Sequence, residues 1–331
     1  MQFFDVLITV GALLVLMVPG YILTKCKVLP EKTDTVLTAL VLYGCQPIMQ
    51  FMSFQKESYD SRIAINMIIV AGISFVVHML MIGIMMLFFR ARKMETKAKI
   101  NCLRFASVFP NCGYMGLPFL SFLFKGTDHL GEIIIYAGVD IAVMNLIMWS
   151  LGVLMITGDR KQMSLKRALL NPTVIALFMG IIVFFTVQTP IAQLGTGATN
   201  QILSKLMEGL NIVGDMVTPL AMILIGFKLA KVKIKDLLFD KWAYLASANK
   251  LILMSVLTMV VVAFLPISIE VKYTLFFCLS MPSATCSTMF AVQFGGDSET
   301  SAVMVLLSTV LSILTIPLMF LLFSRGFGVV I

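Results

Sequence analysis

The sequence predicts an all-α membrane protein: ten transmembrane helices in two inverted five-helix repeats, with the fourth and ninth helices broken. Three observations support this prediction. The 331 residues are 59% hydrophobic and only 13% charged, whereas soluble domains carry about 25% charged residues. The chain contains ten apolar segments close to the roughly 20 residues that a membrane-spanning helix needs. Two proline pairs, Pro47 with Pro219 and Pro110 with Pro282, share one spacing of 172 residues.

The ten predicted spans are separated by short polar connections. The weakest of them is the seventh, because it contains several charged side chains. Asp5 stands where a signal peptide would carry basic residues, so the first segment is interpreted as a retained span. The predicted spans cover residues 3–23, 34–54, 63–89, 100–122, 133–156, 170–188, 202–228, 242–265, 272–294 and 301–323.

Lysine and arginine are distributed unequally between the two sides of these spans. The connections that follow odd-numbered spans and their flanks hold seventeen of them, and the opposite side holds five. Because cytoplasmic loops are enriched in basic residues, the odd-numbered connections are predicted to be cytoplasmic. Both termini are then predicted to lie on the outer side of the cell membrane. The same distribution accounts for the net charge of +8 and argues against nucleic-acid binding.

The shared proline spacing maps each span of the first half onto its counterpart in the second half. Residues 1–156 form the first predicted repeat, 157–169 a short cytoplasmic linker, and 170–331 the second repeat. Each repeat has five spans. Because five is odd, the second repeat enters the membrane from the opposite side, which is an architecture common among secondary transporters.

Pro110 and Pro282 lie near the centres of spans 4 and 9. Proline removes a helical hydrogen bond, and in lipid the freed groups are tolerated only inside protein or beside water. Gly113 weakens span 4 further. Each break would place a half-helix N-terminus near the midplane, where an anion such as a carboxylate is favoured. Simple helix kinks remain the alternative interpretation. The polar residues at the breaks are candidate ligands, namely Asn111, Ser283 and Thr285.

Four segments carry a resemblance to a known family. PNCGYMGLPF (110–119) and MPSATCSTMFAVQFGGD (281–297) resemble the auxin efflux carrier family. NPTVIALFMGI (171–181) and VTPLAMILIGFKLA (217–230) are similar to its bacterial members. That family includes plant PIN auxin exporters and bacterial permeases assigned to malate or malonate. The resemblance extends over essentially the whole chain.

The resemblance implies that spans 4 and 9 cross at the substrate site, in the fold of bile-acid symporters and sodium/proton antiporters. Asn111 matches an asparagine that binds the substrate carboxylate in the plant proteins. The second plant asparagine is replaced here by Pro-Ser-Ala-Thr at 282–285. Asn145 becomes a candidate because its span lies beside the crossing in this family. The long cytoplasmic loop of the plant exporters is absent, which favours a bacterial-type carrier.

Three ionisable residues inside the spans are candidates for ion coupling. Asp215 is the deepest member of a polar stripe on span 7, which we expect to face the bundle interior or a watery cavity. Either it carries a proton or cation, or it is a structural partner of Lys250. Asp140 is either a coupling residue or hydrated. The stripe consists of Ser204, Glu208, Asn211, Asp215 and Thr218.

Other polar residues in the spans are given local roles. Gln46 and Gln50 share a helix face with Tyr43 beside Pro47 and are expected to line the same cavity. His78 stands alone in an apolar span and is interpreted as a hydrogen-bonded packing residue. The six cysteines form no metal-binding or disulfide pattern and are interpreted as small apolar residues.

The sequence therefore predicts a secondary carrier of small organic anions, a mono- or dicarboxylate such as malate or malonate. Alternating access would move spans 3–5 and 8–10 against a scaffold of spans 1, 2, 6 and 7, which also offers a homodimer surface. The alternatives are a proton- or sodium-coupled antiporter using Asp215, an exporter of auxin-like aromatic carboxylates, and a channel. No ATP-binding, HExxH or GxSxG motif is present. No enzymatic activity, cofactor or metal is predicted.

Overall fold

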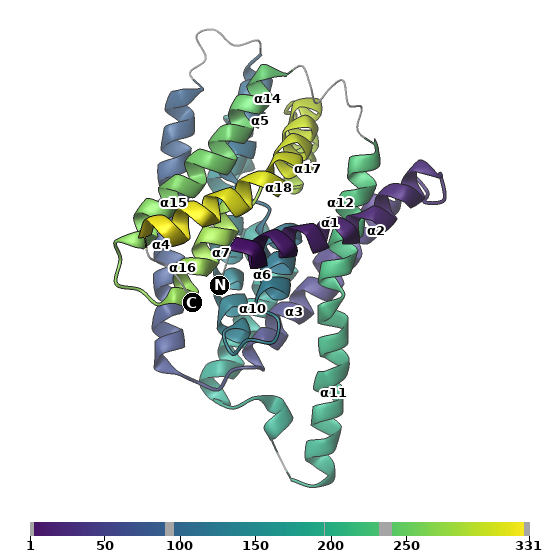
Figure 1. The fold of residues 1–331 in the computed structure, drawn as a ribbon, viewed down its shortest axis with the longest axis vertical. Coiled ribbons are helices and arrows are strands. Elements are labelled where there is room, and N and C mark those ends of the chain that lie inside the picture. The colour runs from purple at the N-terminus through teal and green to yellow at the C-terminus, as the bar shows by residue number, and fades with distance from the viewer. Residues whose placement is uncertain (1–2, 90–95, 195, 232–239, 328–331) are drawn as a thin grey trace.

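The computed structural model describes residues 3–89, 96–194, 196–231 and 240–327, and all regular elements in these ranges are helical. Figure 1 shows a bundle of long helices from which α11 projects at one end. The helices of the first half are α1 (Phe3–Lys25), α2 (Thr33–Ala39), α3 (Gln46–Phe54), α4 (Ser61–Phe88), α5 (Lys97–Val108), α6 (Leu117–Leu123), α7 (Leu130–Ile147) and α8 (Val153–Thr157).

The second half continues the helical pattern. Its α-helices are α9 (Leu165–Leu169), α10 (Pro172–Thr186), α11 (Ala198–Asp215), α12 (Val217–Lys231), α14 (Lys241–Ala248), α15 (Met254–Ala263), α16 (Ile269–Ser280), α17 (Cys286–Gln293) and α18 (Ser298–Phe327). Four π-helical turns lie between these elements, namely η1 (Leu40–Cys45), η2 (Cys112–Gly116), η3 (Met148–Gly152) and η6 (Asn249–Leu253). Two short 3₁₀ turns are η4 (Arg160–Gln162) and η5 (Ile191–Gln193).

Seven helices in the described ranges are long and apolar enough to cross a membrane. The number is eight if the pair Arg160–Leu169 and Pro172–Thr186, bent by 46°, is one span. The predicted spans 4 and 9 are not among them, because both are interrupted where the sequence places Pro110 and Pro282. The prediction of an all-helical membrane protein is confirmed, and so are the two breaks.

Two of the π-turns immediately precede a proline. η1 ends two residues before Pro47, and η2 ends two residues before Pro118. A proline cannot donate to the carbonyl one turn earlier, so the preceding turn widens. The sequence therefore sets the position of these irregularities. A π-turn redirects the side chains around it, and η2 lies directly at the break in span 4.

Contacts near the helix ends show which connections lie at the same end of the bundle. Lys99 pairs with Asp240 at 2.9 Å, and Lys231 Nζ donates to the Glu31 carbonyl at 3.2 Å. These contacts gather the connections after predicted spans 1, 3 and 7 at one end. At the opposite end, Tyr59 N donates to Gln188 O at 2.9 Å. The connections that the charge distribution assigns to one side are thus found together.

Glycines allow two long helices to pack closely. A Cβ at Gly20 of α1 would overlap the Ile223 carbonyl of α12, and one at Gly226 would overlap the Met17 carbonyl. Without those side chains the two backbones come into direct contact, as in membrane helix pairs that associate through small residues. This contact fixes α12 beside α1, and α12 also meets η2.

α7 is the core of the bundle. Of the helices that could span a membrane, the one over Leu130–Thr157 has the largest buried share, at 67%. It packs against α3, α4, α6, α10 and α16 and also touches η2. Because almost every face of α7 meets protein, its polar residues cannot reach lipid and must be paired or line an internal site.

Candidate functional site

The two broken segments meet at their breaks. Asn111 N donates to the Pro282 carbonyl at 2.7 Å, and Ala284 N donates to the Phe109 carbonyl at 2.9 Å. Pro110 and Ser283 form an antiparallel bridge between them. Each break therefore satisfies backbone groups that the other has released, which is what makes extended backbone tolerable at this depth. The segments cross here, as the resemblance implies.

The side chains at the crossing differ in how fully they are satisfied. Thr285 Oγ1 donates to Asn111 Oδ1 at 3.4 Å, and Asn111 is only 2% exposed. The other amide atom, Asn111 Nδ2, is buried and has no hydrogen-bond partner in the described part of the chain. Ser283 is different, because its hydroxyl donates to the Ala106 carbonyl at 2.7 Å. In this conformation Asn111 keeps a free donor and the Ser283 hydroxyl is engaged.

Two glutamines of α3 are inserted against glycines beside the crossing. A Cβ at Gly113 would lie 2.7 Å from Gln46 Nε2, and one at Gly138 would overlap Gln50 Nε2. Gln46 Oε1 and both amide atoms of Gln50 are buried without partners in the described residues. An unpaired buried amide costs about 1–3 kcal/mol. Unpaired amides gathered around the crossing of two half-helices are therefore typical of a polar ligand site.

The face of the fifth span that the sequence singles out also adjoins this region. Asn145 is 6% exposed on α7. Trp149, one turn further on, packs its ring at 4.6 Å from that of Phe290 in α17. α17 is the half-helix that starts at the crossing. The contact places the Asn145–Trp149 face on the side of α7 that borders the broken span.

Asp140 lies in a buried polar network behind the crossing. Ser74 of α4 donates to Asp140 Oδ1 at 2.6 Å, and the Cys112 thiol donates to Oδ2 at 3.3 Å. Lys250 of η6 is fully buried, lies within electrostatic range of Asp140 and donates to the Leu279 carbonyl at 3.0 Å. Leu279 is near the end of α16, so the lysine satisfies a carbonyl that the break releases. The network connects the charges to both broken spans.

His78 borders the same network. Its Nδ1 lies 2.8 Å from the Ser74 carbonyl, and its ring stacks on Phe109 with centroids 6.1 Å apart. These contacts agree with its interpretation as a hydrogen-bonded packing residue. The ring adds a third titratable group to this region, because it lies in electrostatic range of Lys250.

One set of side chains has the spacing of metal ligands. Ligand atoms of Cys112, Asp140 and Cys278 lie within 4.8 Å of one another. Both Asp140 oxygens already accept hydrogen bonds, however, and Lys250 supplies positive charge nearby. A buried carboxylate compensated by an ammonium group does not need a metal ion. The arrangement is better suited to hold or exchange a proton.

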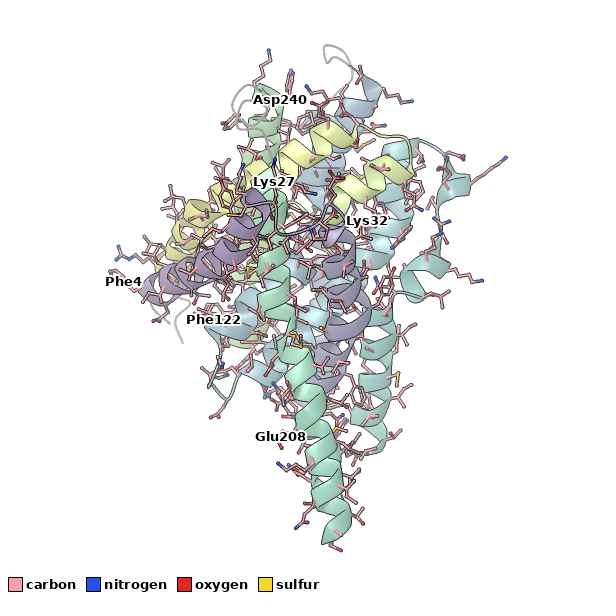
Figure 2. The ribbon with its side chains drawn as sticks, turned by 90° about the vertical axis from the view of Figure 1, so that its right-hand side faces the viewer. Phe4, Lys27, Lys32, Phe122, Glu208 and Asp240 are labelled. Carbon is pink, nitrogen blue, oxygen red and sulfur yellow. The ribbon has the colours of Figure 1, made fainter. Side chains whose placement is uncertain are left out.

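The structure separates Asp215 from this network. Asp215 is exposed at the end of α11, and it makes no pair with Lys250. Of the two surroundings expected for its polar stripe, the bundle interior is excluded: Ser204, Glu208 and Asp215 are exposed, and the Glu208 side chain is 59% exposed beside Lys205. α11 meets α3 through its other face, where Gly214 contacts Met49. Figure 2 shows Glu208 on the outer side of the projecting helix.

Comparison with known proteins identifies the family. The model of the family described as "Membrane transport protein" matches residues 5–320. The chain belongs to this family. A transporter of Methanothermobacter thermautotrophicus is 27% identical over 315 residues, covering 94% of this chain and 96% of that protein. A transporter of Methanocaldococcus jannaschii is 24% identical over 306 residues, covering 92% and 94%. Both are named as uncharacterized transporters. The resemblance to the auxin efflux carriers is confirmed.

For this membrane transport protein, sequence reasoning missed several residues of the buried network. Ser74, Cys112 and Cys278 were interpreted as packing residues or not singled out, because serine and cysteine are common in apolar helices. One signal was available: Cys112 is two residues from Pro110, and Cys278 is four residues from Pro282. Side chains so close to a helix break are positioned to meet across it.

The transporter also has a cluster of acidic residues, Glu57, Asp128 and Glu132, at the end of the bundle where residues 55–60 connect α3 to α4. Glu57 packs against Gly131, and burial, followed by the neighbouring Glu132, raises the pKa of Glu57 to about 7. Arg62 opposes the shift, and Asp128 adds to it. Arg62 itself forms an ion pair with Glu132. The folded transporter therefore binds a proton at Glu57 more tightly than the unfolded chain does.

This proton gives a testable pH dependence. The folded-state pKa is raised, so between pH 4.5 and about 7 the folded state binds more protons than the unfolded state. Stability should therefore fall as the pH rises through this window. In Glu57→Gln that contribution disappears, and the melting temperature in detergent should fall less from pH 5 to pH 8 than in the unmodified protein. Glu31→Gln, at an exposed glutamate, is the control. Equal slopes in all three proteins would contradict the assignment.

Proposed function

We propose that this transporter is a secondary carrier of small organic anions, with a mono- or dicarboxylate such as malate or malonate as its substrate. One observation supports the proposal most directly. Asn111 Nδ2 is a buried, unpaired donor at the point where two half-helices begin. The half-helix N-termini favour negative charge, and the amide can donate to a carboxylate oxygen.

The proposal includes the full span arrangement. The seven long helices, the bent pair and the two broken segments support an assignment of ten spans. We assign residues 1–156 and 170–331 to two inverted repeats joined by 157–169. Pro110 and Pro282 break the equivalent helices, and Gly113 leaves room for the Gln46 amide. Asn145, Ser283 and Thr285 complete the proposed binding residues.

Alternating access then requires a moving unit and a scaffold. Spans 3–5 and 8–10 share the buried network, since Ser74, Asp140, Lys250 and Cys278 come from α4, α7, η6 and α16. On the scaffold, α3 contacts the moving unit, because its glutamines fit against glycines of that unit. The scaffold in the plasma membrane would also provide the homodimer surface. In this arrangement the carrier operates without ATP.

A coupled mechanism is the second candidate, and the position of Asp140 favours it. Its carboxylate is enclosed next to the crossing, as a proton- or sodium-carrying group would need to be. Asp215, the coupling residue favoured by the sequence, is exposed on α11. Asp140, with Lys250 as its neighbour, is therefore proposed to carry the coupled proton. Asp215 is the weaker candidate for that role.

Transport by purified protein tests the proposal. Proteoliposomes preloaded with unlabelled malate or malonate should accumulate the labelled substrate by counterflow, and acetate, succinate and indole-3-acetate should be compared as competitors. Saturable counterflow that only carboxylates inhibit would support a carboxylate carrier, and strong competition by indole-3-acetate alone would favour an aromatic substrate. Solute-independent ion conductance without counterflow would indicate that the protein is a channel and not a carrier.

A further inference from the structure

Lys228 is a basic residue that the loop count treats as an ordinary cytoplasmic charge. It lies on α12, three residues before the helix ends at Lys231. The two lysines differ in environment. Lys231 is exposed, donates to the Glu31 carbonyl and lies 4.2 Å above the Phe227 ring. Lys228 is partly buried and lies within electrostatic range of the Cys286 thiol, at the first residue of α17.

The start of α17 is open to a negatively charged ligand. The residue before it, Thr285, makes no capping hydrogen bond, because its hydroxyl is directed to Asn111 Oδ1. The Ser287 hydroxyl in the first turn is fully buried and has no partner in the described residues, as is true of Asn111 Nδ2. An uncapped N-terminus carries partial positive charge. Two unpartnered polar groups beside it indicate a ligand site and not a packed helix end.

Charge placement links Lys228 to this site. α12 packs against η2, the turn that carries Cys112–Gly116, and against α2. On α2, Asp34 is the carboxylate within electrostatic range of Lys228. The ammonium group therefore lies within electrostatic range of both Asp34 and Cys286, the first residue of α17. A charged lysine in a membrane-spanning helix is costly unless it is paired or faces a hydrated path. Asp34 offsets that cost when no substrate is bound.

We propose that Lys228 is the fixed cation of the substrate site, which holds one carboxylate of the transported anion against the uncapped start of α17. The inference rests on the proposed anion carrier and specifies how that carrier selects charge. One lysine, partly neutralised by Asp34, matches a single carboxylate group. The other end of the substrate, which in a dicarboxylate is the second carboxylate, then meets the amides of Asn111 and Gln46.

Cys286 allows the local charge to be measured without knowing the substrate. In a Cys26→Ser background, Cys286 is the remaining cysteine that is not buried. Its thiolate attacks the sulfenyl sulfur of a methanethiosulfonate, a mixed disulfide forms, and methanesulfinate leaves. We compare the rates for an anionic reagent, sulfonatoethyl methanethiosulfonate, and a cationic one, the trimethylammonium analogue. The ratio of the two rates reports the electrostatic potential at Cys286.

The proposal predicts how this ratio responds to substitution. Lys228→Gln should lower the anionic-to-cationic rate ratio about tenfold, because a unit charge at close range acts oppositely on the two reagents. Lys228→Arg should keep the ratio, and Lys231→Gln is the matched control that should leave it unchanged. An unchanged ratio in Lys228→Gln would overturn the proposal. A Cys286 that neither reagent reaches would also count against it, because a soluble anion must reach the same place.

Transport separates this inference from the proposed function. If the unmodified protein carries malate or malonate, Lys228→Gln should raise the KM at least tenfold while Lys228→Arg stays within a few-fold. If Lys228→Gln does not affect carboxylate transport, the proposed role of Lys228 is wrong, while the proposed carrier function still holds. If the unmodified protein carries no carboxylate, the proposed function fails, and the reagent ratio still decides whether Lys228 sets the local charge.

Discussion

Asn111→Ala is expected to reduce strongly the saturable uptake of the carboxylate substrate by proteoliposomes. The substitution removes the unpaired Nδ2 donor at the crossing, while the backbone bond from Asn111 N to the Pro282 carbonyl is retained. A hydrogen bond to a charged group contributes about 1.5–3 kcal/mol. Losing it should lower kcat/KM roughly tenfold to a hundredfold. Initial rates over a range of substrate concentrations, normalised to reconstituted protein, measure the effect.

Folding of the variant has to be checked separately. The Thr285 hydroxyl loses its acceptor in Asn111→Ala, which is a 3.4 Å contact and therefore weak. The melting temperature in detergent should consequently change little. Asn200→Ala is the matched control, since Asn200 donates to the Ala192 carbonyl before α11, far along the chain from either break. Normal kinetics in Asn111→Ala would remove Asn111 from the binding site.

Lys250→Met is expected to destabilise the folded protein by about 1–3 kcal/mol, because it removes a buried donor and a positive charge within electrostatic range of the buried Asp140. It also leaves the Leu279 carbonyl at the break of α16 without a donor. Unfolding in detergent, followed by circular dichroism, measures the loss. The double variant Lys250→Met/Asp140→Asn should be less destabilised than the sum of the two single variants, because the uncompensated charge is gone.

The same variants distinguish coupling from structure. If Asp140 carries protons, Asp140→Asn should retain exchange in counterflow but lose accumulation driven by a pH gradient. Asp215→Asn is the control with an exposed carboxylate, and its accumulation should match that of the unmodified protein. Accumulation lost in Asp215→Asn and retained in Asp140→Asn would reverse the assignment. Strictly additive stabilities would show that Lys250 and Asp140 are not coupled.

Much of the fold follows from local sequence. Apolar length predicts where helices cross the membrane, and proline predicts where a helical hydrogen bond is missing. The breaks at Pro110 and Pro282 could therefore be predicted without a structure. Asn111 could be identified for the same reason, because it directly follows the first of these prolines. Loop charges grouped the connections that the structure gathers at each end.

The polar stripe of span 7 shows the limit of that reasoning. Spacing establishes that Ser204, Glu208 and Asp215 share one helix face, but not what this face meets. From the sequence, this face is expected to meet the bundle interior or a watery cavity. In the structure Gly214 packs α11 onto Met49 of α3, so that the stripe is directed outward. Which face is buried depends on the partner helix and is not encoded in the periodicity of one helix.

The sequence alone determined that this chain is a helical membrane protein with two broken spans, and its motifs determined the family. Tertiary structure decided which polar groups act together. Asp140 meets Cys112 and Ser74, Lys250 meets the carbonyl of Leu279, and Lys228 lies within electrostatic range of Cys286, although the members of each set are well separated in sequence. Hydropathy and proline act through neighbouring residues, whereas charge pairing depends on distances that only the packed helices define.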